Sequence, residues 1–311
     1  MKKYAAMALG LPILLAACTS VQTPAAISSV QVTGDTTLTI GQQETLSVTL
    51  KDAAGNPLTG RTVTWTSSAP DLVSVDANGR VTARHFTPNG TPNTVTITAT
   101  SEGKRGTLTV TPYGFDLSCG TYVTSDDPGA DVAFYARFRA ENGSNIPADT
   151  NYSIVGPTAF NAGKPYNAVV FQGSSAGAAY GGAPAVAGTY SATLSVAGTT
   201  YSDSCSIDPA VRLGFVTNPV VSVSGNTASY SGTAPAGTIN VFAALFMGDV
   251  SYSTTSVALS SLTFSASGGL SPAAPSGVYK GWIYARNYNN STPMPDVVLW
   301  SGTLANTVTI P

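Results

Sequence analysis

One short pattern in the sequence could place a nucleophile. Gly173-Ser174-Ser175-Ala176-Gly177 fits the G-x-S-x-G arrangement, in which a sharp strand-to-helix turn lifts a serine beside an imidazole. The residues that follow, AAYGGAPAVAG, are too rich in glycine to form that helix. The single histidine, His85, belongs to a different segment of the chain. We therefore expect a loop here, and no catalytic residue.

Metal chemistry has few candidate ligands in this sequence. A catalytic zinc usually needs about three protein ligands, so one histidine excludes a histidine-rich zinc site. Asp126, Asp127 and Asp131 in TSDDPGAD could gather around calcium, which takes about six to eight oxygens. Their spacing is not that of an EF-hand loop, and Pro128-Gly129 indicates a turn. We expect a solvated turn, with neither a metal nor a cofactor.

The segment VYKGWIYARNY (residues 278–288) could bind a ligand through aromatic rings. On a strand, alternate residues share a face, and one face would carry Lys280, Trp282, Tyr284, Arg286 and Tyr288. The other face would carry Tyr279, Ile283 and Ala285. If that second face is buried, the first presents three rings and two cations outward, a candidate ligand-binding face for a glycan. The alternative is that Trp282 and Tyr284 pack against a neighbouring domain or loop.

The N-terminus indicates export. Lys2 and Lys3 precede an apolar run over residues 5–15, which is shorter than the roughly 20 residues that a transmembrane helix needs and is typical of a secretory signal peptide. Leu15-Ala16-Ala17-Cys18 resembles the bacterial lipobox. That resemblance implies that residues 1–17 are removed, that Cys18 carries a lipid, and that residues 18–26 form a linker. An ordinary signal peptide with a coincidental cysteine is the alternative.

The residue after Cys18 bears on which membrane holds the lipid. It is Thr19 rather than aspartate, which resembles the outer-membrane sorting pattern of lipoproteins in two-membrane bacteria. A single-membrane host would instead hold the protein on its plasma membrane. We expect an exported, lipid-anchored protein, at the outer membrane or cell surface rather than at the plasma membrane.

With Cys18 lipidated, Cys119 and Cys205 remain as a pair. In an exported protein such a pair is usually bonded, so we expect a disulfide. Two buried free thiols are the alternative.

Composition excludes one class of partner. Charged residues make up 10% of the chain. Without Lys2 and Lys3 the 14 basic residues become 12, against 16 acidic residues, for a net charge of −4. Nucleic-acid binding needs clustered lysine and arginine to neutralise phosphates, and the sequence has no such cluster.

The elements that must position these residues are strands. In residues 44–50, ETLSVTL, apolar and polar side chains alternate, which is typical of a sheet with one buried face. Similar short segments recur between turns such as Asn78-Gly79, at the spacing of a β-sandwich. No apolar repeat of helical period follows the signal peptide. The sequence therefore predicts an all-β protein.

Residues 27–112 resemble the bacterial immunoglobulin-like group 2 (Big2) family. The resemblance is carried by Gly41, Asp52, Gly55-Asn56, Trp65-Thr66-Ser67-Ser68, Val73-Ser74-Val75-Asp76, Asn78-Gly79 and Val81-Thr82-Ala83. It implies an immunoglobulin-like sandwich with Trp65 as a core residue and no chemistry of its own. One departure is HFTPNGTPNTVTITAT, which is longer than the family's usual connection; we expect a harmless surface loop there.

Two later segments echo one another. Gly188-Thr189-Tyr190 and Gly277-Val278-Tyr279 each enter a strand and are similar to the tyrosine corner of immunoglobulin-type sandwiches. They predict two more sandwiches, over residues 113–209 and 210–311, so that the whole chain is a tandem of immunoglobulin-like β-sandwich domains. Cys119 and Cys205 would then join the first and last strands of the middle domain. A single larger β-domain from residue 113 onward is the alternative.

These inferences favour a lipid-anchored envelope protein that is not an enzyme. The resemblance to Big2 implies presentation, adhesion or envelope architecture. We expect a glycan or an envelope protein as the ligand, and the lipobox implies the membrane as a partner through the lipid. A structural spacer or assembly component of the envelope is the alternative, and an enzyme in residues 113–311 is a minor one. Nucleic acid is not an expected partner.

Overall fold

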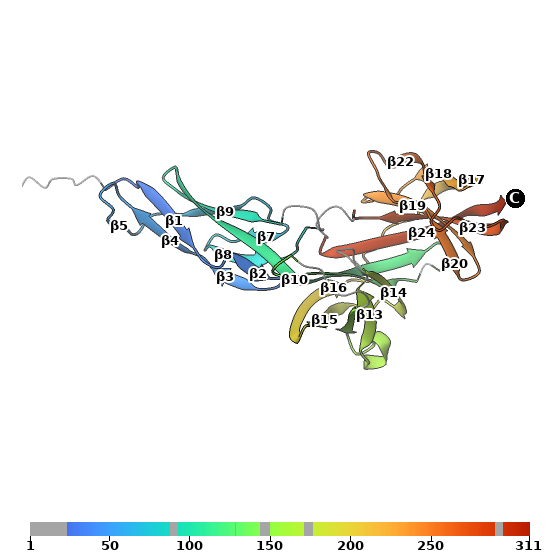
Figure 1. Ribbon diagram of the computed structural model, residues 1–311, viewed down its shortest axis with the longest axis horizontal. Helices are drawn as coiled ribbons and strands as arrows, with labels where there is room; N and C mark the ends of the chain where they lie inside the picture. Colours follow the sequence, from blue (N-terminus) through green and yellow to red (C-terminus); the bar gives the residue numbers. More distant parts are fainter. Residues whose placement is uncertain (1–23, 88–92, 128, 144–149, 171–176, 290–294) are drawn as a thin grey trace, which may run out of the picture.

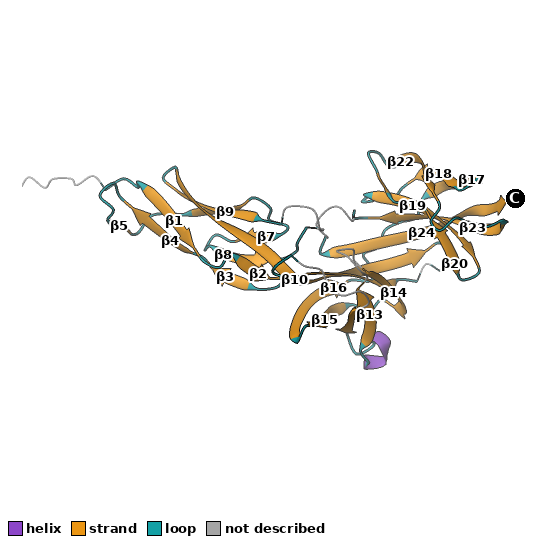
Figure 2. Ribbon diagram, in the orientation of Figure 1, coloured by secondary structure: helices purple, strands orange, loops and turns teal. Residues whose placement is uncertain are grey.

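The computed structural model describes residues 24–87, 93–127, 129–143, 150–170, 177–289 and 295–311. In these residues the regular structure is strand, apart from one short 3-10 turn, η1 (Phe160–Gly163), drawn in purple in Figure 2. The abundance of β-branched residues accounts for this, and the predicted all-β fold is confirmed. Within the described ranges, no helix is long and apolar enough to cross a membrane.

The first domain lies at one end of the elongated molecule (Figure 1). Its strands are β1 (Ser29–Thr33), β2 (Thr37–Thr39), β3 (Gln43–Thr45), β4 (Ser47–Lys51), β5 (Pro57–Leu58), β6 (Thr64–Ser67), β7 (Val73–Val75), β8 (Arg80–Ala83) and β9 (Val95–Ser101). They pair in the orders β1-β4-β5 and β3-β8-β7, with β9 between β6 and β10. Gly79 has a φ of +80°, as expected of an Asn-Gly turn, and it lies against the ring of Trp65.

Strand β10 (Lys104–Thr124) leaves this domain without a break and enters the next one. Its first part pairs with β9 and then with β2, and from Gly114 it pairs with β11 (Asp131–Arg139). Gly114 has a φ of +108°, a conformation that glycine alone adopts readily. The expected boundary between residues 112 and 113 therefore falls within one continuous strand.

A second sandwich is built on β10 and β11. The edge strand β14 (Gly177–Pro184) pairs with β11, and the opposing sheet has the order β13-β12-β15-β16. Those strands are β12 (Thr150–Val155), β13 (Tyr166–Val170), β15 (Gly188–Val196) and β16 (Thr199–Ile207). The core between the sheets includes Phe115, Phe134, Tyr152, Phe160 and Tyr190. A disulfide joins Cys119 on β10 to Cys205 on β16, as predicted.

The third sandwich comprises β17 (Thr217–Ser224), β18 (Thr227–Thr233), β19 (Asn240–Met247), β20 (Val250–Ser253), β21 (Val257–Ala258), β22 (Thr263–Gly269), β23 (Gly277–Arg286) and β24 (Val297–Ile310). The sheet β17-β18-β22 covers part of a larger sheet. The core between them includes Val221, Tyr230, Leu245, Tyr279 and Ile283.

Both predicted tyrosine corners are present. The hydroxyl of Tyr190 donates to the carbonyl oxygen of Val186 at 2.8 Å, and that of Tyr279 donates to the carbonyl oxygen of Pro275 at 2.6 Å. Each tyrosine is buried at the start of its strand and bonds backbone four residues earlier. The two hydroxyls thus fix the entry to β15 and to β23 in the same way.

The second and third sandwiches share one sheet. Strand β24 pairs antiparallel with β23 and parallel with β10, which gives the order β14-β11-β10-β24-β23-β19-β20. The two hydrophobic cores lie on one face of this shared sheet. On the other face a separate cluster of rings gathers. The chain from residue 113 onward therefore has two cores, as two separate sandwiches would, but they share one sheet, as they would in a single larger β-domain. We call this unit the head.

Candidate functional site

The predicted aromatic face lies on the shared sheet, but it is not an exposed surface. Lys280 is exposed, whereas Trp282 and Tyr284 are each 8% exposed, Arg286 6% and Tyr288 1%. The interpretation in which all five residues face solvent is wrong, and the alternative, in which Trp282 and Tyr284 pack against neighbouring parts of the chain, is confirmed. Tyr279, Ile283 and Ala285 do belong to the buried core on the opposite face, so the assignment of the two faces is confirmed.

Neighbouring strands of the same sheet explain this burial. Trp282, Tyr284 and Tyr288 pack with Tyr135 from β11 and Trp300 from β24, in a cluster that also includes Ala133, Ala244 and Val298. These partners come from strands far apart in sequence. A strand considered alone has no such neighbours, and its polar-looking face then appears free.

Arg286 is held inside this cluster by aromatic rings. Its guanidinium lies 5.0 Å from the ring centre of Phe242, 5.2 Å from that of Tyr288 and 5.1 Å from that of Trp300. Its Nε donates to Oδ1 of Asn240 at 2.8 Å. A desolvated cation above ring faces is stabilised by their negative quadrupole. Arg286 therefore positions rings and is not a free group for binding a ligand.

Part of the cluster borders an open hollow with a volume of about 510 Å³, which is in the size class of small-ligand sites. Its lining residues are Tyr122, Phe242, Ala244, Phe246, Ser251, Ser253, Tyr284 and Trp300. The rings of Phe242 and Tyr284 are stacked, with centres 5.0 Å apart and planes 16° apart. We call this the aromatic hollow. Tyr284 is the one residue of the predicted face that lines it.

Two tyrosine hydroxyls meet at the aromatic hollow. Burial raises the pKa of Tyr284, and its hydrogen bond to Tyr122 raises that pKa further. The same hydrogen bond lowers the pKa of Tyr122, although burial raises it overall. Tyr284 therefore donates and Tyr122 accepts, and both hydroxyls stay neutral at physiological pH.

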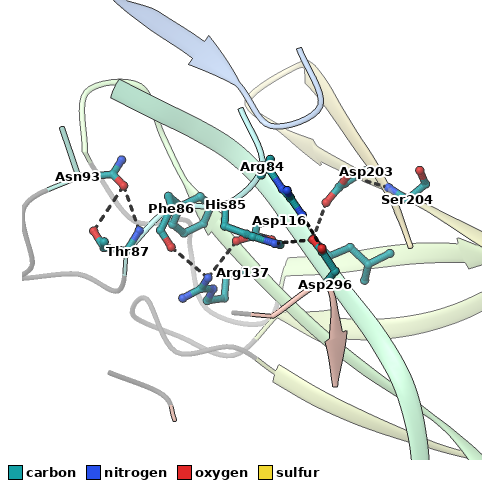
Figure 3. A network of polar contacts seen from close by, with 11 residues as sticks. Arg84, His85, Phe86, Thr87, Asn93, Asp116, Arg137, Asp203, Ser204 and Asp296 are labelled. Carbon is teal, nitrogen blue, oxygen red and sulfur yellow. Dashed lines mark hydrogen bonds and ion pairs between the residues drawn. The ribbon is translucent and has the colours of Figure 1, made fainter. Parts of the chain in front are cut away.

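A second candidate site lies where the first domain meets the head (Figure 3). His85, which follows β8, places Nδ1 2.9 Å from Oδ1 of Asp116 on β10 and Nε2 3.0 Å from Oδ1 of Asp296 before β24. Arg137 on β11 donates from Nη2 to Oδ2 of Asp116 at 2.9 Å. Arg84 pairs with Asp296. We call these five residues the junction network.

The charges of the junction network support one another. Burial of His85 opposes its protonation, but the Asp116 and Asp296 carboxylates outweigh it and raise its pKa. A carboxylate can only accept hydrogen bonds, so a ring with carboxylates at both nitrogens carries both protons. Burial would also raise the pKa of Asp116, yet His85 and Arg137 hold it below its usual value. Because both imidazole nitrogens are engaged, the histidine is not available as a general base.

The expectation of a harmless surface loop after β8 is wrong for the described part of that segment. His85, Phe86, Thr87 and Asn93 are all buried, while residues 88–92 lie outside the described residues. The guanidinium carbon of Arg137 lies over the ring of Phe86, 5.1 Å from the ring centre. The backbone carbonyl oxygen of Phe86 accepts a hydrogen bond from Nη2 of Arg137 at 3.0 Å. The insertion thus fills the boundary between the first domain and the head.

Asp203 on β16 lies beside the network, in a hollow of about 420 Å³ that Arg84, His85 and Asp296 also line. Burial raises its pKa to about 7. Its Oδ2 accepts from the backbone N–H of Leu117 at 2.8 Å. Sequence reasoning missed this residue and the whole junction network, because their members come from distant segments and form no local motif.

The remaining predicted sites divide into two groups. Cys18, the signal peptide and residues 173–176 of the G-x-S-x-G pattern lie outside the described residues. In the acidic turn, Oδ1 of Asp127 accepts from the N–H of Gly129 at 3.1 Å, and burial followed by the Asp127 charge raises the pKa of Asp131. Across the described part of the chain, no group of three or more His, Cys, Asp or Glu side chains could hold a metal.

Comparison with known proteins gives one family match. Residues 47–112 match the family described as "Invasin, domain 4", within the segment that resembles Big2. This supports a bacterial immunoglobulin-like domain, while membership of group 2 stays a prediction. Comparison with curated proteins gave no match.

Solved structures give only distant similarity. The S-layer protein rSbsC is 16% identical with a TM-score of 0.20, and the match covers 90% of this chain and 41% of that one, so this chain spans about two fifths of its length. FdeC, an Escherichia coli adhesin, is 14% identical over 88% of this chain and 96% of its own, with a TM-score of 0.21. The Yersinia pseudotuberculosis adhesin InvE is 14% identical over 65% and 66%, with a TM-score of 0.20. Such TM-scores do not establish a shared arrangement of the whole chain.

Proposed function

We propose that this chain is a lipid-anchored surface protein of the adhesin type, in which the first domain holds the head away from the membrane and the head binds a ligand. The observation that carries this proposal is strand β10, which passes unbroken for 21 residues from the first domain into the head. A flexible linker would let the two parts reorient, whereas a shared strand fixes them.

The junction network supports the same role. It adds a buried charge pair between His85 in the first domain and Asp116 in the head, and a second pair between His85 and the exposed Asp296. The match of residues 47–112 to a domain of an invasin fits a role at the bacterial surface. Lipid attachment at Cys18 would place the first domain next to the membrane, with a glycan or an envelope protein as the ligand of the head.

Protease treatment of intact cells tests this proposal. We expect the mature chain to be cleaved on intact cells of a two-membrane bacterium that expresses it. The matched variant Thr19→Asp changes the sorting residue alone and should leave the chain protected until the outer membrane is permeabilised. Cys18→Ser should abolish lipid labelling. Protection of the unaltered chain on intact cells would contradict the proposal and favour a structural or assembly role in the periplasm.

A further inference from the structure

The aromatic hollow has a lining that suits a neutral ligand. Of the eight lining residues, five are aromatic, two are serines and one is alanine, and none is charged. Burial raises the pKa of Tyr122, and the carboxylates of Asp126 and Asp131 are close enough to raise it further. They would repel an anionic ligand at the rim. Arg286 offers no compensating attraction, because its guanidinium is already enclosed by Phe242, Tyr288 and Trp300. Lys280 is exposed and pairs with Phe246 across the two strands, but it does not line the hollow.

The rings of the hollow are held in fixed orientations. Phe242 stacks on Tyr284, and the ring of Trp282 stacks against that of Tyr284 with planes 19° apart. Trp300 meets Phe242 edge-on, with planes 76° apart. A site whose rings are ordered before binding avoids much of the entropy cost of association. The lining is therefore prepared for a flat partner.

A sugar ring has the matching chemistry. Its C–H faces carry partial positive charge and are attracted to the negative faces of aromatic rings, while its hydroxyls need hydrogen-bond partners at the edge of the ring. Ser251 and Ser253 on β20, which pair with Phe246 and Ala244 of β19, supply hydroxyls in the lining of the hollow. An apolar peptide would leave those hydroxyls without partners, which carries a desolvation cost.

We infer that the aromatic hollow of the head binds a neutral sugar ring of a glycan, stacked on Phe246 and hydrogen-bonded by Ser251 and Ser253. The inference rests on the proposed role of the head as the ligand-binding part of the protein. The site lies on β19 and β20, away from the first domain in Figure 1. It differs from the face predicted by sequence, with which it shares Tyr284.

Tryptophan fluorescence of the purified mature chain tests the inference, because Trp300 lines the hollow and Trp282 stacks against Tyr284, which also lines it. The probes are cellotetraose, maltotetraose and mannotetraose as neutral sugars, with tetragalacturonate as the anionic comparison. We expect one or more neutral sugars to shift the emission, and tetragalacturonate to leave it unchanged.

Two variants alter the hollow without removing a fully buried residue. Phe246→Ala removes a half-buried ring, and Ser251→Trp fills the hollow from an exposed position. Phe246→Ala should weaken sugar binding by about tenfold or more, the size of loss seen when an aromatic ring that stacks on a nucleotide base is removed. Ser251→Trp should weaken it by occluding the hollow. Val250→Trp on the same strand, and Met247→Ala beside Phe246, change exposed side chains that do not line the hollow. They should bind as the unaltered chain does.

The same variants on cells separate this inference from the proposed function. If the chain is cleaved on intact cells but no neutral sugar shifts the fluorescence at millimolar concentration, the sugar site is wrong and the surface role stands. Equal binding by Phe246→Ala and the unaltered chain would also overturn the site. Adhesion that is lost in the hollow variants without any sugar binding would assign the hollow to a protein partner and refute the sugar.

Discussion

Removing the charge of Asp116 should destabilise the junction more than any single change on the surface. Its side chain is 1% exposed and accepts hydrogen bonds from His85 and from Arg137, whose side chain is 2% exposed. Asp116→Asn keeps the shape but leaves a buried guanidinium without its counter-charge. One partner lost from a buried ion pair costs about 3–5 kcal/mol, so we expect the first thermal transition to fall by about 6–20 °C.

Calorimetry of the mature chain measures this shift, with Asp71→Asn as control because Asp71 is exposed. The control should change the free energy of unfolding by less than about 0.5 kcal/mol. Arg137→Met removes the other partner, and the double variant should be less destabilised than the sum of the two singles by about 1 kcal/mol or more. A cost below about 1 kcal/mol for Asp116→Asn, or strictly additive effects, would refute the view that the network carries buried, mutually compensated charge.

Four further predictions concern the fold. The pKa of Asp203 is about 7 in the folded chain, against an ordinary value of 3.8, so the folded state holds this proton more tightly than the unfolded state does. The stability that comes from this proton is lost as the pH rises through about 7. Asp203→Asn should therefore reduce the fall in melting temperature between about pH 5 and about pH 8. Replacing Cys119 and Cys205 together by serine should cost about 4–5 kcal/mol in urea unfolding, since the bond closes a loop with a separation of 86 residues. Tyr190→Phe should cost about 1 kcal/mol in the same assay by removing the corner hydrogen bond. Gly114→Ala, at a φ of +108°, should cost about 1–3 kcal/mol of backbone strain in the same assay.

Local patterns in the sequence predicted the features that depend on residues only a few positions apart. Alternation on β9 placed Val95, Ile97 and Ala99 inside, and all three are fully buried. The Gly-x-Tyr pattern predicted both tyrosine corners because the hydroxyl reaches backbone only four residues away. The pairing of Cys119 with Cys205 followed from the even count that remained after Cys18 was set aside.

Long-range pairing could not be predicted in this way. Nothing near residue 297 indicates that β24 will lie parallel to β10, yet that pairing joins two sandwiches into one sheet. The same pairing brings Trp300 beside Tyr122 and buries most of the face that one of the two interpretations had placed in solvent. His85 likewise appeared to be an isolated residue in a loop, because its partners lie 31 and 211 positions away.

Strand β10 connects every part of the protein on which the proposed function depends. In order along the strand, Val110 belongs to the core of the first domain, Asp116 to the junction network, Cys119 to the disulfide and Tyr122 to the aromatic hollow. A load applied at the hollow would therefore reach the first domain through one covalent backbone. Each of the four attachments ties that backbone to a different neighbour, so the strand cannot slip relative to the sheets without breaking buried contacts. A chain that holds a binding head at a fixed distance from a membrane needs this property, and a chain of domains on flexible linkers lacks it.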